Sequence, residues 1–194
     1  VLLHAIKNTP NNIKSLIAAS ATGFYGNRND ELLTEESPAG KGFLSETTKE
    51  WENAYSTASV RKVLIRIGVV LSPNGGALPE MTKSLRFGIC PVLGNGNQYM
   101  PWIHIDDLCN IFLFAMENER LSGIYNGVSP VPEKHLRLMN AVRKILAPYS
   151  LRINVPSFAL RMLMGERSSI VLDSARISAS KIMLAGYSFR YTDL

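Results

Sequence analysis

Residues 13–26 read IKSLIAASATGFYG, an apolar run that leads directly into a group of hydroxyl side chains. The run at 13–20 is compact and bounded by polar residues, which is typical of a strand buried on both faces of a parallel sheet. Ligands of open α/β sheets bind beyond the carboxyl ends of the strands, so the hydroxyls at 20–26 are expected to face a crevice. A solvated turn with a capping serine is the alternative interpretation.

The segments that follow alternate between strand and helix patterns. Residues 21–42 are rich in glycine, asparagine and proline, which predicts a long loop. A helix is predicted from residue 43, with Leu44, Thr48, Trp51 and Tyr55 on its packed side. The apolar run KVLIRIGVVL at 62–71 predicts a second buried strand, and the order strand, helix, strand indicates a parallel α/β sheet.

Further elements are predicted on both sides of this unit. The first ten residues are typical of the last turns of a helix. A helix is expected at 78–87, an extended segment at 98–105, a helix capped by Asp106, a strand at 123–128 and a helix at 133–146. Beyond residue 148, short helices and a strand indicate a small subdomain.

Composition narrows the class of protein. The chain has 194 residues, 46% of them hydrophobic, and its longest apolar run, 111–116, is far too short to span a bilayer. Cys90 and Cys109 fit no metal or redox spacing, so buried, reduced thiols inside a cell are expected. The net charge is +5, but lysine and arginine form no run with interleaved aromatics. We expect a cytoplasmic protein with no nucleic-acid and no membrane partner, and a module that binds an acidic partner stays open as an alternative.

Two further pairs of polar side chains are candidates for a ligand site. Ser45 and Lys49 are four residues apart and share a helix face, although a lysine there is most often simply solvated. His104 and Asp106 lie two apart on an extended segment and point to the same side. Alternatively, Asp106 only caps the next helix and His104 is a satisfied core histidine.

Taken in order, SATGFYG, FLSETTKEWENA, LIRIGVVLSPNGGALPEM and MPWIHIDDL resemble the extended short-chain dehydrogenase/reductase superfamily. The resemblance is greatest to its atypical branch of epimerase-family proteins, and VPSFALRMLMGE resembles the small terminal domain of that branch. The resemblance implies the C-terminal part of a Rossmann-type parallel sheet with substrate-side segments at 1–147 and a small α+β subdomain at 148–194. It also implies a glycine-rich dinucleotide-binding turn before the point where this chain starts.

The same resemblance implies an NADP- or NAD-dependent oxidoreductase, or a nucleotide-sugar epimerase, that acts on a small molecule and forms a homodimer. Lys49 would hold the nicotinamide ribose. The other residues implied at the cofactor are Ser20, Ala21, Gly68, Val69 and Val70. The residues implied at the substrate are Pro101, His104 and Asp107.

Two departures from the family pattern concern the proton-transfer groups. The tyrosine expected four residues before Lys49 is Ser45, and the hydroxyl residue expected four before Tyr25 is Ala21, flanked by Ser20 and Thr22. A phenol has a pKa of about 10 and can be tuned toward neutrality, whereas a serine without an adjacent base cannot exchange protons in this way. Lys49, Ser20 and Tyr25 are therefore the candidate catalytic residues. A protein that binds the cofactor but is catalytically silent, with a regulatory or redox-sensing role, is the alternative.

Overall fold

The computed structural model describes residues 3, 6 and 8–194, so the helix expected at residues 1–10 falls partly outside the described residues. A three-stranded parallel sheet has the order β1 (Ser15–Ala21), β3 (Arg61–Ile67), β8 (Gly123–Gly127). Ser15 pairs with Arg61 in register, and Val63 pairs with Gly123. The predicted parallel α/β sheet is confirmed. The expectation that β1 is buried on both faces is not met in this chain, since most residues of β1 are partly exposed.

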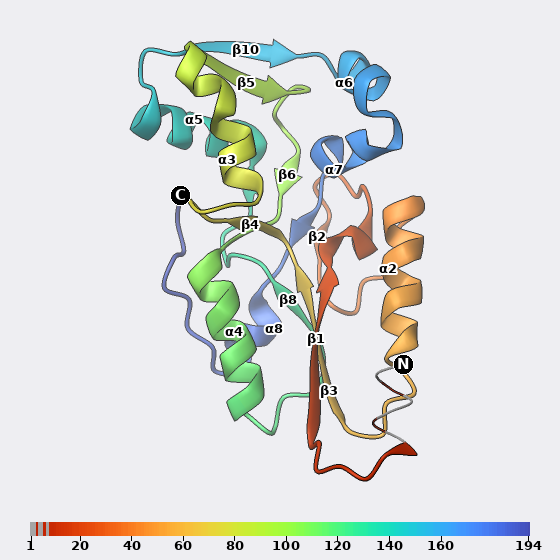
Figure 1. Cartoon of the computed structure of the whole chain (residues 1–194). Helices are drawn as coiled ribbons and strands as arrows, with labels where there is room; N and C mark the ends of the chain where they lie inside the picture. Colours follow the sequence, from red (N-terminus) through yellow and green to blue (C-terminus); the bar gives the residue numbers. More distant parts are fainter. Residues whose placement is uncertain (1–2, 4–5, 7) are drawn as a thin grey trace.

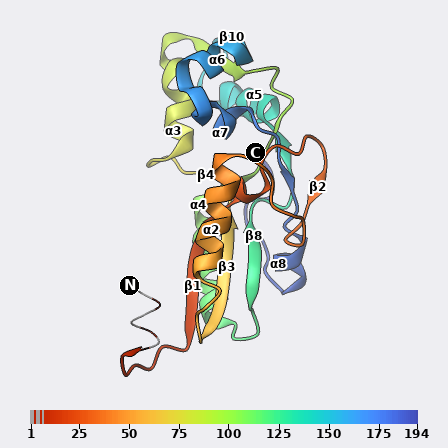
Figure 2. The ribbon, with the colours of Figure 1, turned by 90° about the vertical axis from the view of Figure 1, so that its right-hand side faces the viewer.

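Two helices cover opposite faces of this sheet, α2 (Phe43–Ala54) and α4 (Ile105–Glu117) (Figures 1 and 2). On the α4 side, β3 contributes Val63 and Ile65 to a core that α4 completes with Ile111 and Ala115, all fully buried. The burial of this apolar layer stabilises the sheet.

The second predicted strand is interrupted at Gly68. It divides into β3 and β4 (Val69–Leu71), and β4 pairs with β7 (Trp102–His104) instead of continuing in the sheet. At this break the backbone of Gly68 lies very close to the backbone of Pro101. A Cβ at position 68 would clash with the carbonyl oxygen of Pro101, so only glycine fits there. The chain therefore turns away from the sheet at this glycine.

A second group of elements lies beyond the carboxyl end of the sheet (Figure 1). Its members are α3 (Ala77–Thr82), η2 (Lys83–Phe87), β5 (Ile89–Leu93), β6 (Tyr99–Met100), β9 (Glu133–Lys134), α5 (His135–Leu146), β10 (Leu151–Val155), α6 (Ser157–Met164), η3 (Gly165–Ser168) and α7 (Ser169–Leu172). Its core contains Trp102, Leu138 and Met139 together with Cys90. Both cysteines are free, and the expectation of burial holds for Cys90 but is wrong for Cys109, which is exposed.

The last segments of the chain join strands from both groups. β10 pairs with β5, and β11 (Arg176–Ile177) pairs with β2 (Leu32–Leu33) from the loop after β1. Helix α8 (Ser180–Leu184) packs near β8. The strands of residues 148–194 thus find their partners earlier in the chain, and the boundary after residue 147 stays a prediction. Among the described helices, none has the length and apolar character needed to cross a membrane.

Candidate functional site

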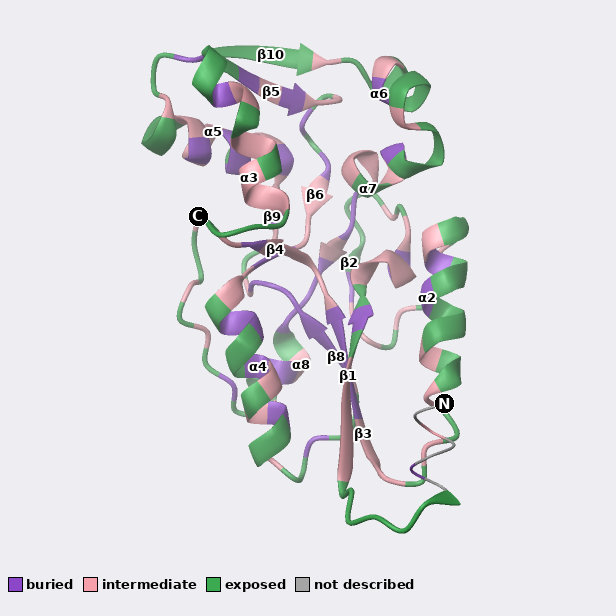
Figure 3. Ribbon diagram, in the orientation of Figure 1, coloured by how far each residue is buried: buried purple, intermediate pink, exposed green. Residues whose placement is uncertain are grey.

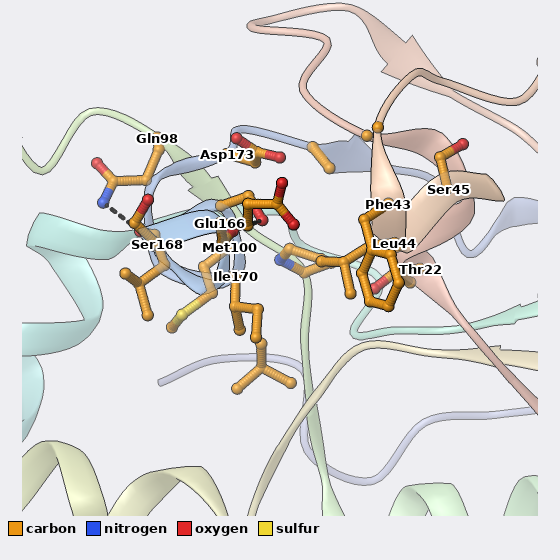
Figure 4. Close-up of a pocket in the computed structure, with 18 of the residues that line it drawn as sticks. Thr22, Phe43, Leu44, Ser45, Gln98, Met100, Glu166, Ser168, Ile170 and Asp173 are labelled. Atoms are coloured by element: carbon orange, nitrogen blue, oxygen red, sulfur yellow. Dashed lines mark hydrogen bonds between the residues drawn. The ribbon is translucent and has the colours of Figure 1, made fainter. Parts of the chain in front are cut away.

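A cavity of about 660 Å³ opens beyond the carboxyl ends of β1 and β3. Thr22 and Gly23 line it directly after β1, and Gly68 and Val69 line it directly after β3. Phe43, Leu44 and Ser45 enter from the start of α2, whereas Glu166, Ser168, Ile170 and Asp173 come from η3, α7 and the segment that follows (Figure 4). The cavity therefore has a sheet-side wall and a wall built by the C-terminal segments, which we call the tail-side wall.

Ser45 lies at the cavity, but its hydroxyl is already engaged. The residue is 1% exposed, and its Oγ donates a hydrogen bond of 2.6 Å to the carbonyl oxygen of Phe24. No general base is bonded to this hydroxyl among the described residues. Lys49, one turn later, is exposed and does not line the cavity.

The buried face of α2 differs from the predicted one. Ser45, Thr48 and Glu52 face inward, whereas Trp51 is 53% exposed. The expectation that Trp51 packs against the sheet is wrong. The reason is that Glu52 is drawn inward by a charged partner, which rotates Trp51 toward solvent.

That partner belongs to a buried polar network behind the cavity. Arg66, on β3, makes a two-point ion pair with Glu52, with Nε–Oε1 and Nη2–Oε2 distances of 2.8 Å. Arg66 also donates to the Tyr25 hydroxyl at 2.9 Å, and that hydroxyl donates to Oδ1 of Asn126 at 2.7 Å. Ser20 donates to Glu52 at 2.6 Å. The network ties α2, the loop after β1, β3 and β8 together.

The network decides where two candidate catalytic residues lie. Ser20 and Tyr25 are both buried in it, and neither lines the cavity. Burial raises the pKa of the Tyr25 phenol, and the neighbouring Arg66 guanidinium offsets this only partly. Thr22, two residues after Ser20, is the hydroxyl residue that does line the cavity, and its Oγ1 donates to the carbonyl oxygen of Ile67.

Three of the residues expected at the cofactor and substrate are brought together at the cavity: Gly68, Val69 and Pro101. The backbone amide of Val69 donates to the Pro101 carbonyl at 2.6 Å, which holds the two segments in contact. Ala21 and Val70 lie outside the lining, and Val70 packs against the core on the α4 side.

His104 and Asp107 lie outside the cavity lining and hold the C-terminal tail instead. His104 is the N-cap of α4, where its Nδ1 accepts from the Asp106 amide, so the expectation that Asp106 caps this helix is wrong. The His104 ring stacks on Tyr191 with centroids 3.7 Å apart. Asp107 is buried and accepts from the Tyr187 hydroxyl and from the backbone amide of Tyr191.

The tail-side wall was not anticipated from the sequence. It carries the charged residues Arg161, Glu166 and Asp173, more than a hundred residues after Ser45. Burial raises the pKa of the Asp173 carboxyl, and Arg161 partly offsets this rise. No spacing or motif marked these residues, because only the folding of the tail across the sheet brings them to the cavity.

Asp173 is held in place by the residue that follows it. The Ser174 amide donates to Oδ1 of Asn27 at 3.1 Å, and its hydroxyl donates to the Asn29 carbonyl at 2.7 Å. The same hydroxyl accepts from the Tyr99 amide at 3.0 Å. These bonds join the tail to the loop after β1 and to β6, so the Asp173 carboxyl is presented from a fixed backbone.

Comparison with known proteins identifies relatives across the chain. The model of the family described as NAD dependent epimerase/dehydratase matches residues 1–126, and the model of a domain of unknown function, DUF1731, matches residues 155–194. The chloroplastic SDR39U1 homologue of Arabidopsis thaliana, an epimerase family protein, is 36% identical over 190 residues. That match covers 96% of this chain and 54% of the relative, so the chain spans about half of that protein's length.

Two solved structures support the same relationship. Human epimerase family protein SDR39U1 (isoform 2), crystallised with NADPH, has a TM-score of 0.88 and 28% identity. The match covers 99% of this chain and 66% of the human one. The nucleoside-diphosphate sugar epimerase of Corynebacterium glutamicum has a TM-score of 0.72 and 34% identity over 93% of this chain and 35% of that chain.

Proposed function

Because the chain belongs to the NAD-dependent epimerase/dehydratase family, we propose that it supplies the nicotinamide side and the substrate side of an NADP-linked oxidoreductase or epimerase-like protein. The observation that carries the proposal is the cavity at the carboxyl ends of β1 and β3, the place where open parallel sheets bind ligands. The NADPH in the crystal structure of the human relative favours NADP over NAD.

The sheet-side wall fits a flat ring. Gly23 and Gly68 carry no side chain, and Thr22 and Val69 are small, so a planar group can approach the backbone closely. Bound NADP would supply hydride transfer through its nicotinamide ring. We assign the contact with that ring to Thr22, Gly68 and Val69. The ribose contact that the family resemblance implies for Lys49 would lie outside the cavity lining, on the exposed face of α2.

Proton transfer is the step that the family's missing tyrosine leaves open. The Tyr25 hydroxyl is engaged with Arg66 and Asn126, and the Ser45 hydroxyl with Phe24. Asp173 is the carboxylate of the tail-side wall that burial affects, since burial raises the pKa of its carboxyl and Arg161 partly offsets the rise, and a carboxyl group in a cavity can act as a general acid or base. We therefore assign proton transfer to Asp173.

The engaged hydroxyls of Ser45 and Tyr25 also favour a second candidate function. A protein with this pocket could bind the cofactor without turnover and act as a regulatory or redox-sensing partner. The two functions differ in a measurable way, because both predict NADPH binding and only the first predicts consumption of NADPH or interconversion of a sugar.

The test uses the full-length product of the gene. Titration with NADPH, followed by nucleotide fluorescence and by the melting temperature, is expected to saturate and to stabilise the fold by about 2.7 kcal/mol at a hundredfold excess over Kd. No binding at millimolar NADPH would overturn the proposal.

Turnover is then measured with nucleotide sugars, aldehydes and ketones. Turnover that Lys49→Ala abolishes would exclude the silent function, whereas binding without any turnover would exclude the enzymatic one. The Asp173→Asn variant is expected to retain NADPH binding and to lose most of the turnover.

A nucleotide sugar as substrate, a homodimer and a cytoplasmic location remain predictions. The name of the Arabidopsis relative places that protein in the chloroplast.

A further inference from the structure

The end of the molecule farthest from the three-stranded sheet carries many exposed apolar side chains. They come from the end of η2, the end of α5, β10 and α6, and Figure 3 marks β10 and much of α6 as exposed. We call this group the apical surface; its members are Phe87, Ile145, Leu146, Tyr149, Leu151, Ile153, Phe158, Met162 and Leu163. Exposed apolar groups of this extent usually mark a contact with a partner or a membrane.

These side chains stand on an ordered backbone. Leu151 pairs in register with Ile89, and its amide donates to the Gly88 carbonyl at 2.7 Å. The turn that presents Tyr149, which is fully exposed, is closed by two bonds from Ser150 to the Ala147 carbonyl, one from its amide at 3.0 Å and one from its hydroxyl at 2.7 Å. The exposure is therefore a property of the folded structure.

The charged side chains on the elements that carry the apical surface are all basic. Between Glu133 and Glu166 the sequence contains six lysine or arginine residues and no aspartate or glutamate. Between Glu80 and Asp106 it contains two basic residues and again no acidic one. The exposed basic residues beside the apolar side chains are Arg86, Lys144, Arg152 and Arg161. Within residues 8–194, no carboxylate forms an ion pair with any of these four.

We propose that the apical surface binds an anionic lipid bilayer and lies in its headgroup region. Exposed apolar and aromatic side chains bordered by lysine and arginine are the features that hold a protein at an anionic membrane interface. Tyrosine suits this position because its ring enters the apolar boundary while its hydroxyl stays hydrated. The proposal departs from the expectation of no membrane partner, which was drawn from the apolar runs of the sequence, all too short to span a bilayer.

Two other occupants fit these observations less well. A second copy of the chain would bring two basic surfaces together, and the repulsion opposes association. An acidic protein would need a surface that matches the shape of the apical side chains, and of these side chains Phe158 is the one that lines either of two cavities in the described part of the chain. A bilayer accepts protruding side chains without matching their shape.

The experiment is cosedimentation of the full-length protein with vesicles. We expect little binding to phosphatidylcholine alone and clear binding to a mixture of phosphatidylcholine and phosphatidylglycerol, weakened by added salt. Equal binding to the two vesicle types, or none to either at low salt, would overturn the proposal.

Matched variants test whether the apical surface, and not another part of the protein, binds the vesicles. Lys144→Glu combined with Arg152→Glu is expected to lower the partition coefficient at least tenfold, since each basic residue near the surface contributes on the order of 1 kcal/mol. Arg120→Glu, at an exposed position in the loop after α4, serves as the control. Leu163→Ser is expected to lower partitioning about tenfold, whereas Leu184→Ser on α8 changes an equally exposed leucine, 88% against 86%, outside the apical surface.

Two results with these variants would overturn the proposal, and the second would assign the apical surface to another role. If the apical variants bind vesicles as well as their controls do, the proposal fails. If they lower the mass of the protein in analytical ultracentrifugation and leave vesicle binding unchanged, the surface is an interface between copies. All the altered positions are exposed, so unchanged melting temperatures are expected and are checked first.

Discussion

The two walls of the cavity differ in origin and in chemistry. The sheet-side wall consists of the backbone and small side chains of Thr22, Gly68 and Val69, which follow directly after strands. The tail-side wall carries both carboxylates of the lining, Glu166 and Asp173, together with Arg161, whereas Lys41 enters the cavity from the segment before α2. The sheet-side wall thus contributes close-packed backbone and the tail-side wall contributes the carboxylates, so changes in the two walls should have different consequences.

The largest effect is expected behind the sheet-side wall, at Glu52. Glu52→Gln leaves the Arg66 guanidinium buried without its counter-charge, at 2% side-chain exposure, and should lower the free energy of unfolding by about 3–5 kcal/mol. Urea denaturation measures this change. Glu50→Gln alters an exposed neighbour on the same helix and should stay within about 0.5 kcal/mol of the wild type. Similar losses in both variants would contradict a structural role for the buried pair.

A smaller effect is expected in the sheet-side wall itself, at Gly68. Gly68→Ala forces a methyl group against the Pro101 carbonyl and should cost about 1–3 kcal/mol of stability. It should also weaken NADPH binding, because the wall moves. Gly75→Ala is the control, since a Cβ there meets no atom within 4 Å. Unchanged stability and NADPH affinity in the Gly68→Ala variant would show that the close approach has no role.

The pH dependence of stability provides a third test, at His135, which lines the cavity from the start of α5. Burial lowers the pKa of its imidazole below the ordinary value of about 6.5, and its Nε2 accepts from the Leu93 amide. Because the unfolded chain binds the proton more tightly, stability should fall as the pH drops below about 6.5. His135→Gln should flatten that part of the profile in thermal melts from about pH 5 to pH 8. A profile unchanged by the substitution would assign the pH dependence to other groups.

The smallest effect on stability is expected in the tail-side wall, at Asp173. Burial raises the pKa of its carboxyl, so the ionised form disfavours the folded state and the wild type loses stability as the pH rises through that pKa. Asp173→Asn should therefore melt slightly higher than the wild type at neutral pH, and the difference should shrink in acid. Asp30→Asn, at an exposed aspartate, provides the comparison. A clear loss of stability at Asp173 would mean that the residue has a structural role.

Sequence patterns were sufficient where a structure depends on neighbours in the chain. The three strands of the sheet and the helix that begins at Phe43 agree with the expectations. Gly68, Val69 and Pro101, which the family resemblance named, line the cavity, and their contact with a cofactor or substrate stays a prediction. The patterns were misleading for α2, because the apolar Trp51 indicated the packed face and the charged Glu52 occupies it. Helical periodicity assigns apolar residues to the core. The inward position of Glu52 is an exception that depends on its ion pair with Arg66, which lies on another element, β3.

The sequence by itself determined the alternation of strand and helix, the family and the missing tyrosine, because each depends on residue types at short spacings. Only the tertiary structure decided the surroundings of those residues. It buried Tyr25 beside Arg66, brought Asp173 to the cavity and used Asp107 to hold the tail. It also gathered basic residues that are scattered in the chain at one end of the molecule. The reason is that desolvation and Coulomb energies depend on distances between residues far apart in sequence, and those distances exist only after folding.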